Sequence, residues 1–230
     1  MLDNPPKTSL GLKFAAGVAY ALELHRSQYR KKSTVPYAAH LLGVSSIALE
    51  FGATEDEAIA ALLHDAVEDC GGRPILDYIG LRFGLDVAAI VEGCSDSFEE
   101  DPAAKKDPWF GRKRRYIAKL SKESDSTLLV SASDKLYNAL ATFNDVGRFG
   151  PAVFDRFNSK KWGTLWYYRA LAAAFAATPG RHAAIAPRLD EIVTILAGNA
   201  MSVDELRAKF EVDTDVDDRE KGQLASSASA

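Results

Sequence analysis

The sequence predicts an all-α fold, a single-domain helical bundle. Apolar residues recur at helical spacing through most of the chain, glycines and prolines punctuate these periodic segments, and no run of alternating strand residues with turn dipeptides occurs. With 230 residues, 47% of them hydrophobic, the chain can bury a substantial core. We expect an N-terminal extension over residues 1–9, one domain over 10–212, and a disordered tail over 213–230, where large apolar residues become rare.

Each expected helix rests on apolar periodicity and on a start or stop signal. Helices are predicted at residues 10–26, 38–51, 55–67, 74–83, 86–93, 109–121, 128–143, 154–177, 182–197 and 201–210. Thr54 and Glu57 form a capping-box pattern that opens the third helix, and Gly71-Gly72 breaks it. Residues 95–108 are acidic and proline-containing, so we expect a loop there.

Composition and charge exclude several classes of protein. The net charge of −4 argues against a general nucleic-acid binder, which would usually be basic. Two cysteines are too few for a disulfide framework or a thiolate zinc site. The first residues lack the basic-then-apolar order of a signal peptide, and the apolar stretch 170–177 is far shorter than the roughly 20 residues of a membrane span. We therefore expect a cytoplasmic protein with no membrane or nucleic-acid partner; whether it forms a homo-oligomer stays open.

The most informative segment is His64-Asp65-Ala66-Val67-Glu68-Asp69, which follows an apolar run. If the helix continues through it, His64 shares a side with Glu68, and Asp65 with Asp69. His64 and Asp65 can bind a divalent metal, and the acidic pair one turn later can then take a proton from water. A structural reading stands beside this one, because acidic residues at a helix end can simply be solvated.

His40 and Asp134 supply further candidate ligands. A lone histidine on an apolar helix is usually a packing residue, and Asp134, flanked by apolar positions, could instead pair with Lys135. Together with His64 and Asp65, the two would form a mixed nitrogen and oxygen set that suits manganese, iron or zinc better than magnesium or calcium.

The order His40, His64-Asp65, Asp134 resembles the H…HD…D pattern of the HD-domain phosphohydrolases. The segments around His25, His40, His64 and Asp134 look like the hydrolase domain of RelA/SpoT enzymes, and most like the single-domain small alarmone hydrolases. The likeness covers about residues 10–200 and implies a helical HD-domain bundle with a central metal site. Leu41 and Cys70 stand where proline and threonine are common in the family, and neither is an expected ligand.

The resemblance also implies a role for individual residues. It makes His40, His64, Asp65 and Asp134 the ligands of a manganese ion, and Glu68 and Asp69 the residues that activate water. It places Arg30 and Lys31 against the guanine base and phosphates of a nucleotide, and Asn138 near its ribose. The implied reaction removes the 3′-diphosphate of guanosine tetra- or pentaphosphate as pyrophosphate, leaving GDP or GTP.

Two alternatives remain at this point. The same metal chemistry could serve another nucleotide, such as NADPH or the adenosine analogue of the alarmone. A non-catalytic nucleotide-binding module is also conceivable, but the full set of candidate ligands and acidic residues argues against it. The basic run Arg112–Arg115 could equally contact 5′-phosphates or form a plain surface. The aromatic residues 166–168 could pack helices together or lie at a subunit interface.

Overall fold

The computed structural model describes residues 7–95 and 108–212. Within these residues the secondary structure is helical, apart from one isolated antiparallel bridge between Tyr29 and Pro36. The helices follow one another as α1 (Leu12–Leu24), α2 (Ala38–Glu50), α3 (Glu55–Leu63), α4 (Ala66–Cys70), α5 (Arg73–Phe83), α6 (Leu85–Cys94), α7 (Trp109–Leu120), α8 (Asp125–Phe149), η1 (Pro151–Arg156), α9 (Lys160–Ala177), η2 (Arg181–Ala184) and α10 (Ala186–Ala197), and residues 203–212 are also helical. The predicted all-α bundle is confirmed.

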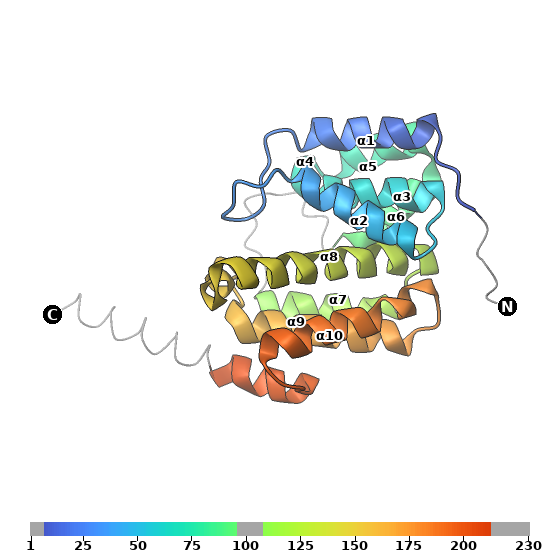
Figure 1. Ribbon diagram of the computed structural model, residues 1–230. Helices are drawn as coiled ribbons and strands as arrows, with labels where there is room; N and C mark the ends of the chain where they lie inside the picture. The colour runs from blue at the N-terminus through green and yellow to red at the C-terminus, as the bar shows by residue number, and fades with distance from the viewer. Residues whose placement is uncertain (1–6, 96–107, 213–230) are drawn as a thin grey trace.

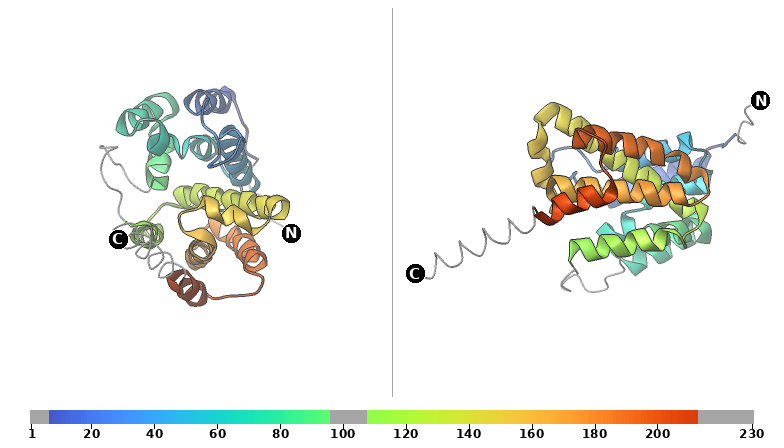
Figure 2. Two further views of the ribbon diagram at one scale, coloured as in Figure 1. Left: turned by 90° about the vertical axis from the view of Figure 1, so that its left-hand side faces the viewer. Right: turned by 90° about the horizontal axis from the view of Figure 1, so that it is seen from below.

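The long helix α8 lies between two groups of helices (Figure 1). Helices α1 to α6 pack on one side of it, and α7, α9 and α10 lie on the other, as the two turned views also show (Figure 2). Ser124 caps α8 by accepting a hydrogen bond from the amide of Thr127, and the helix ends at Gly150, whose φ of 76° suits glycine. Because α8 is covered on both sides, every residue from Thr127 to Asp134 is buried.

Helix α3 begins as predicted but ends earlier. Thr54 and Glu57 form the capping box, and residues from Ala58 to Leu63 are all buried. The expected continuous helix over 55–67 is wrong: the helix stops at Leu63, His64 and Asp65 form a turn, and α4 starts at Ala66. Both turn residues keep right-handed helical backbone angles. The break is therefore small, and the spacing of apolar residues in the sequence does not reveal it.

The predicted helix over 154–177 is also divided. A 3-10 helix, η1, precedes an extended Phe157, and α9 begins only at Lys160, whose φ is 51°. Asn158 and Ser159 lie in the break, and both residue types bond readily to nearby backbone in place of helix formation. The predicted helix over 182–197 is divided as well, into the 3-10 helix η2 and α10, which begins at Ala186. The remaining helices lie close to their predicted ranges, α8 being longer at both ends.

Other expectations have mixed outcomes. Trp166, Tyr167 and Tyr168 are buried, and Trp109 of α7 lies against the first two, which confirms the helix-packing interpretation. Most of the expected loop 95–108 and the whole tail 213–230 lie outside the described residues. Among the residues that are described, we find no helix with the length and apolar character needed to cross a membrane.

Candidate active site

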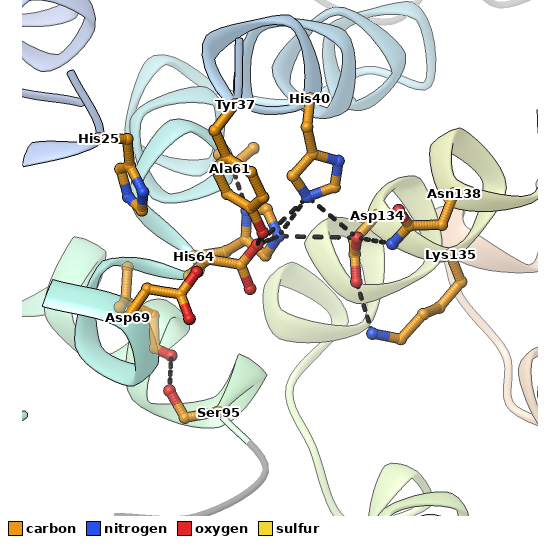
Figure 3. Close-up of polar contacts among 12 residues, drawn as sticks. His25, Tyr37, His40, Ala61, His64, Asp69, Ser95, Asp134, Lys135 and Asn138 are labelled. Atoms are coloured by element: carbon orange, nitrogen blue, oxygen red, sulfur yellow. Dashed lines mark hydrogen bonds and ion pairs between the residues drawn. The ribbon is translucent and has the colours of Figure 1, made fainter. Parts of the chain in front are cut away.

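Four polar side chains from three parts of the fold converge beside α8, and Figure 3 labels three of them, His40, His64 and Asp134. His40 comes from α2, His64 and Asp65 from the corner between α3 and α4, and Asp134 from α8. Nε2 of His64 lies 3.0 Å from Oδ2 of Asp65, and Nε2 of His40 lies 3.2 Å from the same oxygen. Oδ1 of Asp134 lies 3.4 Å from His40 Nε2 and 3.6 Å from His64 Nε2.

The corner after α3 explains how two adjacent residues can face one site. In a continuous helix, neighbouring side chains point about 100° apart. Here His64 is the C-cap of α3 and Asp65 the N-cap of α4, and their side chains meet. Nδ1 of His64 lies 2.9 Å from the carbonyl oxygen of Ala61 and donates to it, which leaves Nε2 free to act as a ligand atom.

Each carboxylate of the cluster is held by further side chains. The hydroxyl of Tyr37 donates to Oδ2 of Asp65 at 2.6 Å. The Asn138 amide donates to Oδ1 of Asp134 at 2.5 Å, and Nζ of Lys135 donates to its other oxygen. The ion pair between Asp134 and Lys135 that the sequence suggested is therefore present, and Asp134 also lies close to the two histidines. Pairing with Lys135 does not prevent Asp134 from being a candidate metal ligand.

The electrostatics of the cluster favour a cation. Burial alone would lower the pKa of His64, but the carboxylates of Asp65 and Asp134 raise this pKa well above its usual value. Burial would raise the pKa of Asp65, yet the imidazoles of His64 and His40 hold it well below its usual range. Burial lowers the pKa of His40 despite the same carboxylates. The carboxylates of Asp65 and Asp134 supply negative charge that attracts a metal ion.

The geometry fits a divalent metal. One ligand atom each from His40, His64 and Asp65 can be chosen so that all lie within 4.8 Å of one another. Metal–ligand bonds of about 2.1 Å place neighbouring ligand atoms about 3.0 Å apart in an octahedron and about 3.4 Å apart in a tetrahedron. The separations of 3.0 to 3.6 Å in the cluster match these values. Residues His40, His64 and Asp65 can therefore hold a divalent metal, and an oxygen of Asp134 lies within 3.6 Å of both imidazoles.

The two acidic residues after the corner lie on α4. Glu68 and Asp69 are both exposed, in contrast to the buried histidines. Figure 3 shows the Asp69 carboxylate directed toward the group formed by Tyr37, His40 and His64. Asp69 is also among the charges that raise the pKa of Tyr37, after burial of the phenol and the nearby Asp65. The structure therefore places Asp69 beside the cluster and within reach of solvent.

The candidate substrate contacts lie along one edge of the cluster. Arg30 donates to Oδ1 of Asn138 at 2.9 Å, so these two residues and Asp134 form a hydrogen-bonded chain. Lys31 is exposed, and its Nζ lies 3.4 Å from Oδ1 of Asn158. Arg30 and Asn138 thus meet at the site, whereas Lys31 lies at its outer margin.

Sequence reasoning missed several residues that build the site. Two of them are Tyr37, which donates to Asp65, and Gly43 of α2. The Tyr137 ring lies so close to Gly43 that a Cβ there would be 2.0 Å from Cε2 of the ring. This close approach lets the ring reach His40, with ring centroids 5.3 Å apart. The sequence signal for this close approach is a glycine inside a helical pattern, at position 43.

The basic run on α7 is only partly explained. Arg114 lies over the ring of Phe110, and Nζ of Lys113 is 5.0 Å from the centroid of Tyr167. Both contacts bind the charged side chains to aromatic residues of the fold. They favour neither of the two interpretations of this run as a phosphate contact or a plain surface.

A family model described as "HD domain" matches residues 17–149, a span that holds all four convergent side chains and the acidic pair. The chain belongs to the HD domain family. Its HD signature is His64-Asp65, the two residues of the α3–α4 corner.

Curated relatives match about half of the length of this chain. The chain is 39% identical over 122 residues to a Xenopus tropicalis protein named guanosine-3′,5′-bis(diphosphate) 3′-pyrophosphohydrolase MESH1, a match that covers 52% of this chain and 63% of the frog protein. It is 33% identical over 120 residues to a Brucella melitensis protein named GTP pyrophosphokinase rsh, covering 52% of this chain and 15% of that protein. The chain thus spans less than two thirds of the length of either relative.

Solved structures match over a longer span. One, described as a metazoan ortholog of SpoT that hydrolyzes ppGpp, aligns with a TM-score of 0.62 and 30% identity, covering 81% of this chain and 96% of its own. A Listeria monocytogenes protein aligns with a TM-score of 0.58 and 23% identity, covering 68% of this chain and 97% of its own, and supports the fold alone.

Proposed function

We propose that this HD domain hydrolyses the 3′-diphosphate of guanosine tetra- or pentaphosphate, giving pyrophosphate and GDP or GTP. The observation that carries the proposal is the convergence of His40, His64, Asp65 and Asp134 beside an exposed acidic pair. Similarity to the frog protein named as a 3′-pyrophosphohydrolase, and to the metazoan SpoT ortholog described as hydrolysing ppGpp, supports this substrate class.

The four convergent side chains would hold a manganese ion. Two imidazole nitrogens and two carboxylates form the mixed donor set that this ion accepts. When bound, such an ion lowers the pKa of water and offsets negative charge on a phosphoryl group. His64 is prepared for this role by its hydrogen bond to Ala61, and Asp65 by its bond from Tyr37.

Glu68 and Asp69 would take the proton of the attacking water. Both are exposed on the helix that follows Asp65, and the Asp69 carboxylate is directed toward the cluster. The water oxygen forms a bond to the phosphorus attached to the ribose, and the bond from that phosphorus to the 3′-oxygen breaks. The 3′-oxygen recovers a proton and remains with the nucleoside, while pyrophosphate leaves.

Arg30, Lys31 and Asn138 would bind the nucleotide. Arg30 presents a planar guanidinium that can stack on a base or bond to phosphate oxygens. Its bond to Asn138 ties the nucleotide-binding edge to Asp134, one of the proposed metal ligands. Lys31 would add charge at the outer margin, where a polyphosphate still faces solvent.

Product analysis tests this proposal. The manganese-loaded protein is incubated separately with guanosine tetraphosphate, its adenosine counterpart and NADPH, and the products are separated by ion-exchange chromatography. We expect GDP and pyrophosphate from the first substrate at a rate well above the others. Release of orthophosphate from NADPH at the higher rate would contradict the assignment.

A further inference from the structure

The turn after α1 carries two polar side chains to which the proposed mechanism gives no role. His25, the C-cap of α1, is 3% exposed, and Gln28 is half-buried. Nδ1 of His25 lies 2.6 Å from Oε1 of Gln28. Nε2 of Gln28 donates to Oδ2 of Asp69 at 2.7 Å. A buried imidazole is therefore linked through one amide to an exposed carboxylate of the site.

The chemistry of these groups fixes the direction of the link. An ionised carboxylate accepts hydrogen bonds only, so the amide of Gln28 must present its NH₂ group to Asp69. Its carbonyl oxygen then faces His25 and accepts a hydrogen bond from Nδ1, which makes Nδ1 the protonated nitrogen. The amide can bond to both neighbours in this one orientation, and each neighbour holds it there.

Gln28 is also held through its backbone. Its amide nitrogen donates to the carbonyl of His25 at 3.0 Å, and its own carbonyl accepts from the amide of Tyr37 at 2.9 Å. The ring of His25 in turn stacks on Tyr37 with an interplanar angle of 22°. The side chain of Gln28 thus starts from a rigid base between α1 and α2.

Asp69 needs such support because it is exposed. A carboxylate on a helix surface samples several rotamers, and only some of them point at a given water. A fixed donor that bonds to one oxygen selects a rotamer and leaves the other oxygen available. Proton transfer requires the acceptor within hydrogen-bond reach, so the selected rotamer affects the rate.

We propose that His25 and Gln28 are positioning residues that hold the Asp69 carboxylate in the orientation for accepting the proton of water. This inference rests on the proposed function, in which Asp69 handles that proton. The side-chain hydrogen bonds of Gln28 reach only His25 and Asp69, so their loss should act on turnover and leave metal affinity unchanged.

The test uses Gln28→Met, which keeps the length of the side chain and removes its hydrogen bonds. Ser27→Ala, an exposed position in the same turn, is the matched control. The full chain is loaded with manganese, and kcat, KM for guanosine tetraphosphate and manganese affinity are measured. We expect kcat to fall about 10-fold in Gln28→Met, consistent with the loss of a hydrogen bond to a charged group. KM and manganese affinity should stay at the values of Ser27→Ala.

A double-mutant cycle shows whether Gln28 acts through Asp69. Rates of Asp69→Asn and of Asp69→Asn with Gln28→Met are measured with radiolabelled substrate to quantify small residual activity. Because the orientation of Asp69 no longer matters once its carboxylate is gone, Gln28→Met should add no further loss. An equal loss in both backgrounds, or wild-type kcat in Gln28→Met beside an impaired Asp69→Asn, would overturn the positioning role alone. Wild-type kcat in Asp69→Asn would overturn the role of Asp69 itself.

Discussion

Tyr37 donates a 2.6 Å hydrogen bond to Oδ2 of Asp65, the oxygen that also lies within 3.2 Å of the nearest nitrogens of His40 and His64. Tyr37 is the N-cap of α2, three residues before His40, so one short segment supplies a proposed ligand and also holds another. Burial and the neighbouring Asp65 raise the pKa of Tyr37, so its hydroxyl keeps its proton and remains a donor.

Replacing Tyr37 with Phe should weaken metal binding while preserving the fold. Loss of a residue that supports a metal ligand typically costs 10- to 100-fold in affinity, and we expect about 10-fold here. Isothermal titration calorimetry with manganese measures it. Tyr29→Phe is the control, because Tyr29 is 57% exposed and lies in the same connecting segment. Equal manganese affinities for Tyr37→Phe and the control would contradict the supporting role.

Gly43→Ala should destabilise the protein, because the new Cβ would overlap the ring of Tyr137. Overpacking of this kind costs about 1–3 kcal/mol in the free energy of unfolding, which urea denaturation measures. Gly147→Ala offers a matched substitution in α8, where a Cβ meets nothing within 4 Å. It should stabilise by about 0.5–1 kcal/mol through helix propensity. Stabilisation by both substitutions would show that the ring of Tyr137 moves aside freely.

Glu57 should make stability depend on pH. Burial raises the pKa of this carboxyl, but hydrogen bonds from Arg181, Ser126 and the Thr54 backbone outweigh burial and lower the pKa to about 2. A depressed carboxyl pKa stabilises the fold fully above the unfolded value near 4.5, and this stability is lost as pH falls toward 2. The shift corresponds to stabilisation on the order of 3 kcal/mol at neutral pH.

Urea unfolding of the wild type and of Glu57→Gln at several pH values tests this effect. The wild type should be the more stable at pH 7, and its advantage should shrink below pH 4.5. Taking the difference between the two proteins removes the contribution of the other carboxylates. A difference that is the same at pH 7 and pH 3 would show that the ion pair with Arg181 does not depress the pKa of Glu57.

Local sequence signals predicted much of the fold. The capping box at Thr54 and Glu57 set the start of α3, and Gly84 marked the end of α5, because both signals act through hydrogen bonds and backbone angles of neighbouring residues. The break at His64 and Asp65 had no such signal. Both residues keep helical backbone angles, and the turn is supported by contacts to residues distant in the sequence, such as Tyr37.

The candidate site was predictable as a set of residues but not as an arrangement. Each of His40, His64-Asp65 and Asp134 was a candidate because these residue types are costly to bury unless paired or metal-bound, and their order, which resembles the HD-domain pattern, marked them as one set. The link from Gln28 to Asp69 spans 41 residues, and that from Arg30 to Asn138 spans 108. Such contacts depend on how α1, α4 and α8 pack, which periodicity does not specify.

The central claim is that metal binding and proton transfer belong to different carboxylates of one short segment. The measurement that tests it compares Asp65→Ala with the double variant Glu68→Gln and Asp69→Asn, recording bound manganese and pyrophosphate released from guanosine tetraphosphate on the same samples. We expect Asp65→Ala to lose metal and hydrolysis together, and the double variant to keep its metal and lose hydrolysis. Full hydrolysis by the double variant, or unchanged metal content in an inactive Asp65→Ala, would contradict the account.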